Sequence, residues 1–124
     1  MTAEQVAEAN LNLGDMYRDG DGVPKDDAEA VRWYRLAAEQ GHARAAYNLG
    51  LMYETGEGVP QDYVRAHMWY KLAGSRSTRT LQETYWRIFA GRTRDSLATR
   101  MTPDQIAEAQ RLATEWDAAH TRER

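Results

Sequence analysis

The chain has 124 residues, of which 42% are apolar and 28% are charged, and its formal net charge is −3. This length and composition are typical of one folded domain and exclude a disordered chain. The small negative charge argues against binding nucleic acid or anionic lipid with the whole surface. The lack of cysteine excludes disulfide scaffolds, thiolate zinc sites and thiol nucleophiles.

The N-terminus, Met1-Thr-Ala-Glu-Gln, lacks the basic and apolar regions of a signal peptide. We therefore expect a cytoplasmic location by default, and a periplasmic or exported location if a signal has been removed. No apolar run approaches the roughly 20 residues that a membrane span requires, so we expect no membrane partner.

A first helix is predicted to begin after Thr2, which can form a capping box with Gln5. Small and apolar residues then recur at helical spacing, at Val6, Ala9, Leu13, Met16 and Tyr17. Gly20-Asp-Gly22 ends the helix, because glycine readily adopts the positive φ of a tight turn.

A second helix is predicted after Val23-Pro24, with Asp26 as its N-cap and Glu29 completing a capping box. It continues through Ala30, Trp33-Tyr34 and Ala37, and Gly41 is placed just past its end. The first unit therefore reads as helix, turn, helix.

The same unit recurs at a constant offset of 36 residues. A fixed period between roughly 20 and 50 residues indicates a stacked repeat protein. We expect the helices of the second unit at about 44–55 and from Tyr63 to Ala73 or Gly74, with Asp62 as the matching cap.

Both copies have a glycine in the middle of the first helix, Gly14 and Gly50. Glycine costs about 1 kcal/mol relative to alanine in a helix, so its use at the same place twice predicts a steric reason. We expect close helix–helix approach, with Trp33 or Trp69 lying over the gap.

The repeat stops after residue 74, and residues 74–80 are predicted to be a polar loop or a frayed helix start. Thr80 and Glu83 offer a capping box for a helix from about Leu81 to Thr99, in which Gly91 is predicted to mark a kink or a break. Its apolar positions are Leu81, Tyr85, Ile88, Phe89 and Leu97, with Trp86 alongside.

A last helix is predicted at Met101-Thr-Pro-Asp-Gln105, which places a Thr cap before a proline at the first helical position. The tail at 121–124 is expected to be loose. The apolar face of this helix consists of Ile106, Ala109, Leu112, Ala113 and Trp116.

The string LGxMYxxGxGVPxDxxxAxxWYxLA, present twice, resembles the Sel-one-like repeat family, and MTPDQIAEAQRLATEW resembles the terminal capping helix of many bacterial members. The resemblance covers about residues 9–74 and implies an all-α fold: a short right-handed α/α solenoid of tetratricopeptide-like hairpins with C-terminal capping helices. We expect one domain, with repeat one at about 9–44, repeat two at about 45–74 and the helical cap at about 75–121. Residues 75–92 depart from the usual tail of the family.

No arrangement of residues predicts catalysis, a cofactor or a metal site. His42, His67 and His120 are too widely spaced to form a metal pair on one helix face. The paired acidic residues have capping roles, and the GxG turns lack the Lys-Ser/Thr of a phosphate loop. We therefore expect neither enzyme activity nor a bound cofactor.

Residues that differ between the copies are better candidates for recognition than shared ones, which serve packing. The first helix of each unit lines the concave face in this fold class, and its variable residues share one face there. The shared asparagines beside that face either hydrogen-bond a bound peptide or tie one helix to the next. The candidate partner-binding residues are Asn12, Asp15, Tyr47, Asn48, Leu51, Glu54, Trp86 and Arg87.

Residues 76–94 interleave five arginines with aromatic residues, and residues 75–100 carry a net charge of +4. The segment is either a docking surface for an acidic protein or nucleic acid, or an amphipathic helix whose aromatics cap the solenoid. We favour the second interpretation.

The favoured function is a protein–protein interaction module, an adaptor or scaffold, that binds a peptide or partner protein on the concave face. One alternative is a small enzyme or ligand-binding protein with a pocket between the repeats and the C-terminal helices. A third is weak nucleic-acid binding through residues 76–94. We expect a monomer or a weak homo-oligomer, with nucleic acid the less favoured partner.

Overall fold

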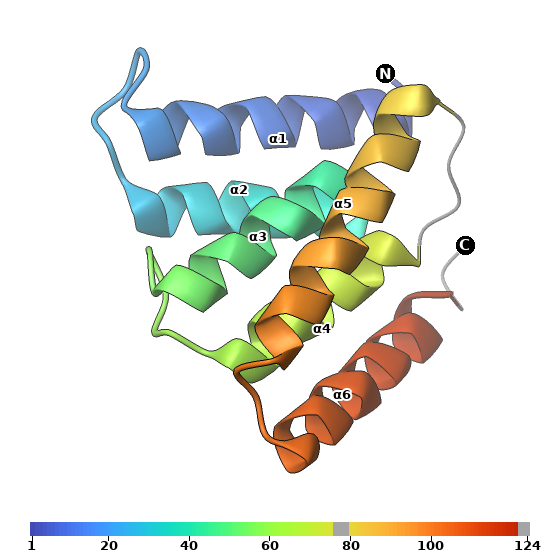
Figure 1. Cartoon of the computed structure of the whole chain (residues 1–124). Coiled ribbons are helices and arrows are strands. Elements are labelled where there is room, and N and C mark those ends of the chain that lie inside the picture. Colours follow the sequence, from blue (N-terminus) through green and yellow to red (C-terminus); the bar gives the residue numbers. More distant parts are fainter. Residues whose placement is uncertain (76–79, 122–124) are drawn as a thin grey trace.

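The computed structural model describes residues 1–75 and 80–121, and within them the chain folds into helices joined by short turns (Figure 1). This architecture confirms the predicted all-α solenoid class. The predicted polar segment at 76–79 and the predicted loose tail at 122–124 lie outside the described residues. The helices are α1 (Ala3–Asp19), α2 (Asp27–Glu39), α3 (Ala43–Thr55), α4 (Tyr63–Gly74), α5 (Leu81–Ala98) and α6 (Pro103–Thr121).

The helices begin where the sequence places their capping residues. At the start of α6, Thr102 and Gln105 form the reciprocal capping box, and the same motif opens α1. At the start of α2, the Asp26 carboxylate accepts from the Glu29 N–H at 3.1 Å. The Asp26 N–H donates to the carbonyl of Tyr17 at 2.8 Å, so this backbone donor is already satisfied and the box predicted there is one-sided.

The two mid-helix glycines allow a close helix contact, as predicted, but the ring that fills it is a tyrosine and not a tryptophan. A Cβ atom built on Gly14 would lie 2.5 Å from the Tyr34 ring, and one on Gly50 would lie 2.5 Å from the Tyr70 ring. Both rings are fully buried. The prediction of Trp33 or Trp69 at this place is therefore wrong by one residue, which corresponds to a rotation of about 100° around the helix.

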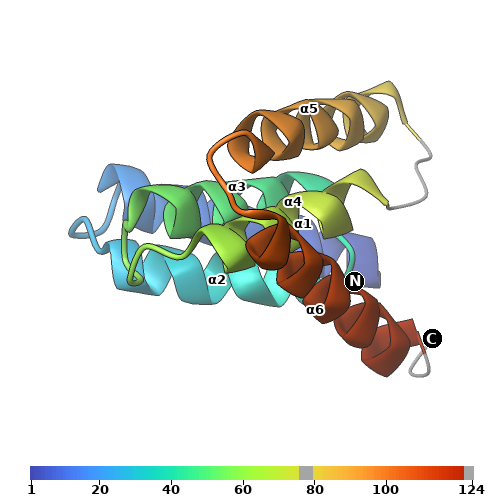
Figure 2. The same ribbon diagram turned by 60° about the horizontal axis from the view of Figure 1, so that its bottom comes forward.

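The two repeat hairpins, α1–α2 and α3–α4, stack with α3 seated against α2. The C-terminal helices do not continue this pairing, because α5 packs across α3 and α4 whereas α6 packs on α4. Figure 2 shows α5 and α6 on opposite sides of α4. Both C-terminal helices therefore pack on the second repeat hairpin.

Helix α5 is continuous through Gly91, so it is not broken there into two shorter helices. The glycine instead lies where α5 crosses the end of α4. A Cβ built on Gly74 would lie 3.9 Å from the Gly91 Cα and 3.6 Å from the Arg87 carbonyl oxygen. These are ordinary van der Waals distances, and a Cβ built on Gly91 meets nothing within 4 Å, so an alanine side chain would fit at either position.

The apolar positions predicted for α5 divide into two groups. Leu97 is fully buried and Trp86 packs against the core. Leu81 is 91% exposed and Ile88 is 49% exposed, with Tyr85 also exposed between them. The N-terminal half of α5 is therefore packed on one side only, because α3 and α4 cover a single side of this helix.

Candidate partner-binding surface

Helix α5 lies across the side of α3 that carries the predicted recognition residues. The Tyr47 ring contacts the rings of Trp86 and Phe89 on α5, with centroid distances of 5.5 and 5.2 Å. It also lies 5.6 Å from the Tyr70 ring, and it is 8% exposed. Burial raises the pKa of the Tyr47 hydroxyl above its ordinary value. Tyr47 is thus mainly a core residue that holds α5 in place.

Arg44 joins three helices at this surface. Its guanidinium lies 3.8 Å from the Asp15 carboxylate on α1 and 5.2 Å from the centre of the Trp86 ring on α5. Its Nε atom is buried and has no hydrogen-bond partner among the described residues. Sequence reasoning missed Arg44. The available signal was the replacement of Glu8 in the first copy by a basic residue at the same repeat position.

Each repeat tyrosine is anchored to a carboxylate, but the carboxylate occupies a different position in each copy. The Tyr34 hydroxyl donates to Asp15 at 2.5 Å, and the Tyr70 hydroxyl donates to Glu54 at 2.7 Å. Burial, followed by the hydrogen bond to a carboxylate, raises the pKa of both tyrosines above their ordinary value. The repeat counterpart of Asp15 is Leu51, so the acid has moved by about one helical turn.

Glu54 has a second partner at the far end of α3. Its other carboxylate oxygen pairs with Arg100, which follows α5 in the chain. The Arg100 guanidinium also lies over the Tyr63 ring, 5.4 Å from its centre. Glu54 therefore ties the second repeat to the connection between α5 and α6, in addition to its predicted role at the surface.

The two shared asparagines differ in their surroundings. Asn12 is exposed on α1, whereas Asn48 on α3 is 5% exposed. The Asn48 Nδ2 atom is buried without a hydrogen-bond partner among the described residues. Asn48 lies four residues after Arg44, so both unsatisfied donors lie on one side of α3.

The structure thus gathers part of the predicted site. Asp15, Tyr47 and Trp86 meet around Arg44, with Leu51 half-buried further along α3. Glu54 lies at the other end of that helix. Arg87 lies next to Trp86 in the chain, is partly buried, and has an Nε atom with no partner among the described residues.

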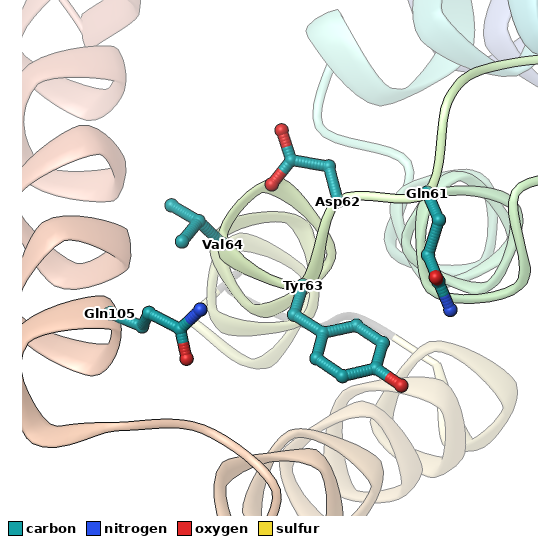
Figure 3. A pocket seen from close by; sticks show the side chains of 5 residues that line it. All are labelled: Gln61, Asp62, Tyr63, Val64 and Gln105. Atoms are coloured by element: carbon teal, nitrogen blue, oxygen red, sulfur yellow. The ribbon is translucent and has the colours of Figure 1, made fainter.

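Two hollows lie between the repeats and the C-terminal helices, where the alternative function needs a pocket. One, of about 350 Å³, lies at the starts of α4 and α6. Figure 3 shows Gln105 of α6 extending toward the first turn of α4, which carries Tyr63 and Val64. The other is a groove of about 670 Å³ between α2, α4 and α6, and its lining includes Trp69 and Trp116.

Of the three histidines, only His120 lines one of these hollows, the groove between α2, α4 and α6. His67 is 3% exposed, and its pKa is lowered by burial and then by the charges of Arg94 and Lys71. It is absent from the lining of both hollows. His42 instead accepts from the Ala45 N–H and lies 2.7 Å from Glu8, and so joins the two repeats.

Within residues 1–75 and 80–121, no three or more His, Asp and Glu side chains converge as a metal site would require. Over the same residues, no helix has the length and apolar character needed to cross a membrane.

Comparison with known proteins identifies the repeated unit. The model of the Sel1 repeat matches residues 7–42 and again residues 43–77. No curated protein matches the sequence. A protective antigen present in uropathogenic Escherichia coli strains, which displays an SLR fold, is 32% identical and superposes with a TM-score of 0.82. The match covers 94% of this chain and 23% of that one, so the chain spans about a quarter of its length.

A Sel1 repeat protein from Oxalobacter formigenes is 44% identical over 55% of this chain and 28% of its own, with a TM-score of 0.54. Both similar structures are thus built from the repeat that the family model finds here. Because the two matched units together span more than half of the sequence, the chain belongs to the Sel1 repeat family.

Proposed function

We propose that this chain is a non-catalytic protein-interaction module that binds a peptide segment of a partner protein on the side of the array lined by α1, α3 and α5. Sel1 repeats are generally protein-interaction modules. The observation that carries the choice of surface is the pair of buried donors on α3, Arg44 Nε and Asn48 Nδ2, that lack acceptors among the described residues.

A buried donor without an acceptor costs about 1–3 kcal/mol of stability. A bound segment whose oxygen atoms accept from these donors removes that cost, and this favours binding. Peptide carbonyls and carboxylates are the acceptors that a protein partner offers. Access to Arg44 requires the Trp86 ring, which covers its guanidinium, to move aside. The exposed amide of Asn12 and the carboxylate of Asp15 extend the surface onto α1.

The charges at this surface are mixed. Asp15 and Glu54 supply carboxylates, while Arg44 and Arg87 supply guanidinium groups. This mixture suits a partner segment whose own side chains carry both signs. Leu51, half-buried between the charged groups, adds an apolar contact.

A peptide library displayed on phage and selected on the immobilised chain tests the proposal. Peptides that are enriched should bind the Arg44→Lys variant at least several-fold more weakly, because lysine keeps the charge but removes the Nε donor. Arg32→Lys is the matched control, since Arg32 is an exposed arginine on α2 that pairs with Glu29. Equal binding to both variants, with circular dichroism showing both folded, would place the site elsewhere.

A second candidate function rests on the groove between α2, α4 and α6. The ring of Trp116 stacks on His120 at 3.6 Å and meets Trp69 at 5.5 Å, which forms an aromatic wall suited to a planar ligand. A screen of small aromatic compounds, monitored by tryptophan fluorescence with Trp116→Leu as control, distinguishes it from peptide binding. No saturable quenching in that screen would exclude this candidate.

A further inference from the structure

Helix α1, at the edge of the array in Figure 1, carries a copy of a surface that α3 uses for packing. In α3 the five residues of this surface are at most 8% exposed. Their counterparts in α1 are of the same five types, yet Asn12 is exposed and the other four are partly buried. We call these counterparts the α1 outer face: Ala9, Asn12, Leu13, Met16 and Tyr17.

The second repeat shows what this surface does when it is covered. It meets the helix before it, α2, and Arg35 of α2 donates to the Tyr53 hydroxyl at 2.6 Å. Gly58, which follows α3, leaves room for the backbone of Asp27 in the preceding hairpin. Its counterpart after α1, Gly22, has no such neighbour, since the nearest atom to a Cβ built there is the Met16 methyl at 3.7 Å. The α1 outer face therefore has the shape and residue types of a surface that receives another helix.

Helix α5, which crosses α3 and α4, carries an exposed apolar surface of its own. Leu81 and Ile88 are 91% and 49% exposed, and the rings of Tyr85 and Phe89 stack on each other at 5.8 Å. Their spacing places Leu81, Tyr85 and Ile88 on one side of the helix. Figure 2 shows this helix on the outside of the molecule. We call these four residues the α5 outer face.

The two segments that carry these faces also have opposite charge. The first hairpin, residues 1–41, contains nine Asp and Glu against four Lys and Arg, a net charge of −5. Residues 80–100, which contain α5, hold four Arg against one Glu and one Asp, a net charge of +2. Pairing either face with itself brings like charges together, whereas pairing the two different faces brings opposite charges together.

We propose that the α5 outer face of one copy docks on the α1 outer face of a second copy, so that the chain associates head to tail. Leu81, Tyr85 and Ile88 supply apolar side chains that project from their helix. The α1 outer face supplies a surface with small Ala9 beside the larger Met16. This contact is heterologous, because it joins two different surfaces. It therefore links successive copies into a chain and does not form a symmetric dimer.

Sedimentation velocity of the full chain over a wide concentration range, at low and high salt, tests this directly. The mean mass should rise with concentration and fall with added salt. Two variants block one end each: Asn12→Arg places a cation on the α1 outer face, and Leu81→Glu with Ile88→Glu places acids on the α5 outer face. The replaced side chains are exposed, so circular dichroism should show both variants folded.

Each blocked variant alone should stay monomeric, and an equimolar mixture should form a dimer and stop there, because each variant retains one intact face. A wild-type chain that stays monomeric at every concentration would overturn the proposal. Association that survives Asn12→Arg but not the α5 variant would also overturn it, since that pattern indicates symmetric pairing through α5. A mixture that forms no dimer would overturn it as well.

Discussion

Replacing Gly50 with alanine should destabilise the protein, although alanine is the better helix former. The added Cβ would lie 2.5 Å from the Tyr70 ring and 3.2 Å from the Ala66 carbonyl oxygen. The ring cannot move aside freely, because it is fully buried and its hydroxyl is bonded to Glu54 at 2.7 Å. Overpacking costs about 1–3 kcal/mol, and loss of that hydrogen bond costs about 1 kcal/mol. Improved helix propensity returns about 1 kcal/mol, which leaves a net loss of about 1–3 kcal/mol.

Gly91→Ala is the matched control. It also lies within a helix, but a Cβ built there meets nothing within 4 Å. It should therefore stabilise the protein by about 0.5–1 kcal/mol. Urea denaturation followed by far-ultraviolet circular dichroism gives the free energy of unfolding of both variants. If Gly50→Ala were as stable as the wild type, or if both variants shifted stability in the same direction, the close-packing explanation would be refuted.

Three further changes have defined outcomes. Tyr70→Phe should lower the free energy of unfolding by about 1 kcal/mol in urea titrations, because the bond to Glu54 is lost. Asp62→Ala should lower it by about 1 kcal/mol in the same assay, because α4 loses its N-cap. The lowered pKa of buried His67 means that the unfolded chain binds its proton more readily. The free energy of unfolding should therefore be highest above pH 6.5, the ordinary pKa of histidine, and should fall as the pH drops from there toward the lower pKa of the folded protein. His67→Val, which places the residue of the first repeat (Val31) at this position, should make thermal melts less dependent on pH in this range.

The repeated unit made most of the fold predictable from sequence. Two aligned copies fixed the helices, the Asp26 and Asp62 caps and the mid-helix glycines without any structural information. The identity of the ring over Gly50 was not predictable in the same way. Adjacent residues such as Trp69 and Tyr70 point about 100° apart on a helix, so a small uncertainty in helix phase exchanges them.

The C-terminal segment was harder, because it has no second copy for comparison. Its helices were predicted, but the direction in which α5 crosses α3 depends on contacts between segments far apart in sequence. That crossing places Trp86 over Tyr47 and Arg44, which makes Tyr47 a packing residue and brings Arg44 into the candidate site. It also leaves Leu81 exposed, because α3 and α4 cover a single side of α5.

Chemical-shift mapping of the isotope-labelled chain with a library-selected peptide tests most directly whether a partner segment binds on the side lined by α1, α3 and α5. We expect the largest changes at the side-chain resonances of Asn12, Asn48 and Arg44 Nε. Shifts confined to the indole resonances of Trp69 and Trp116, in the groove between α2, α4 and α6, would contradict this expectation.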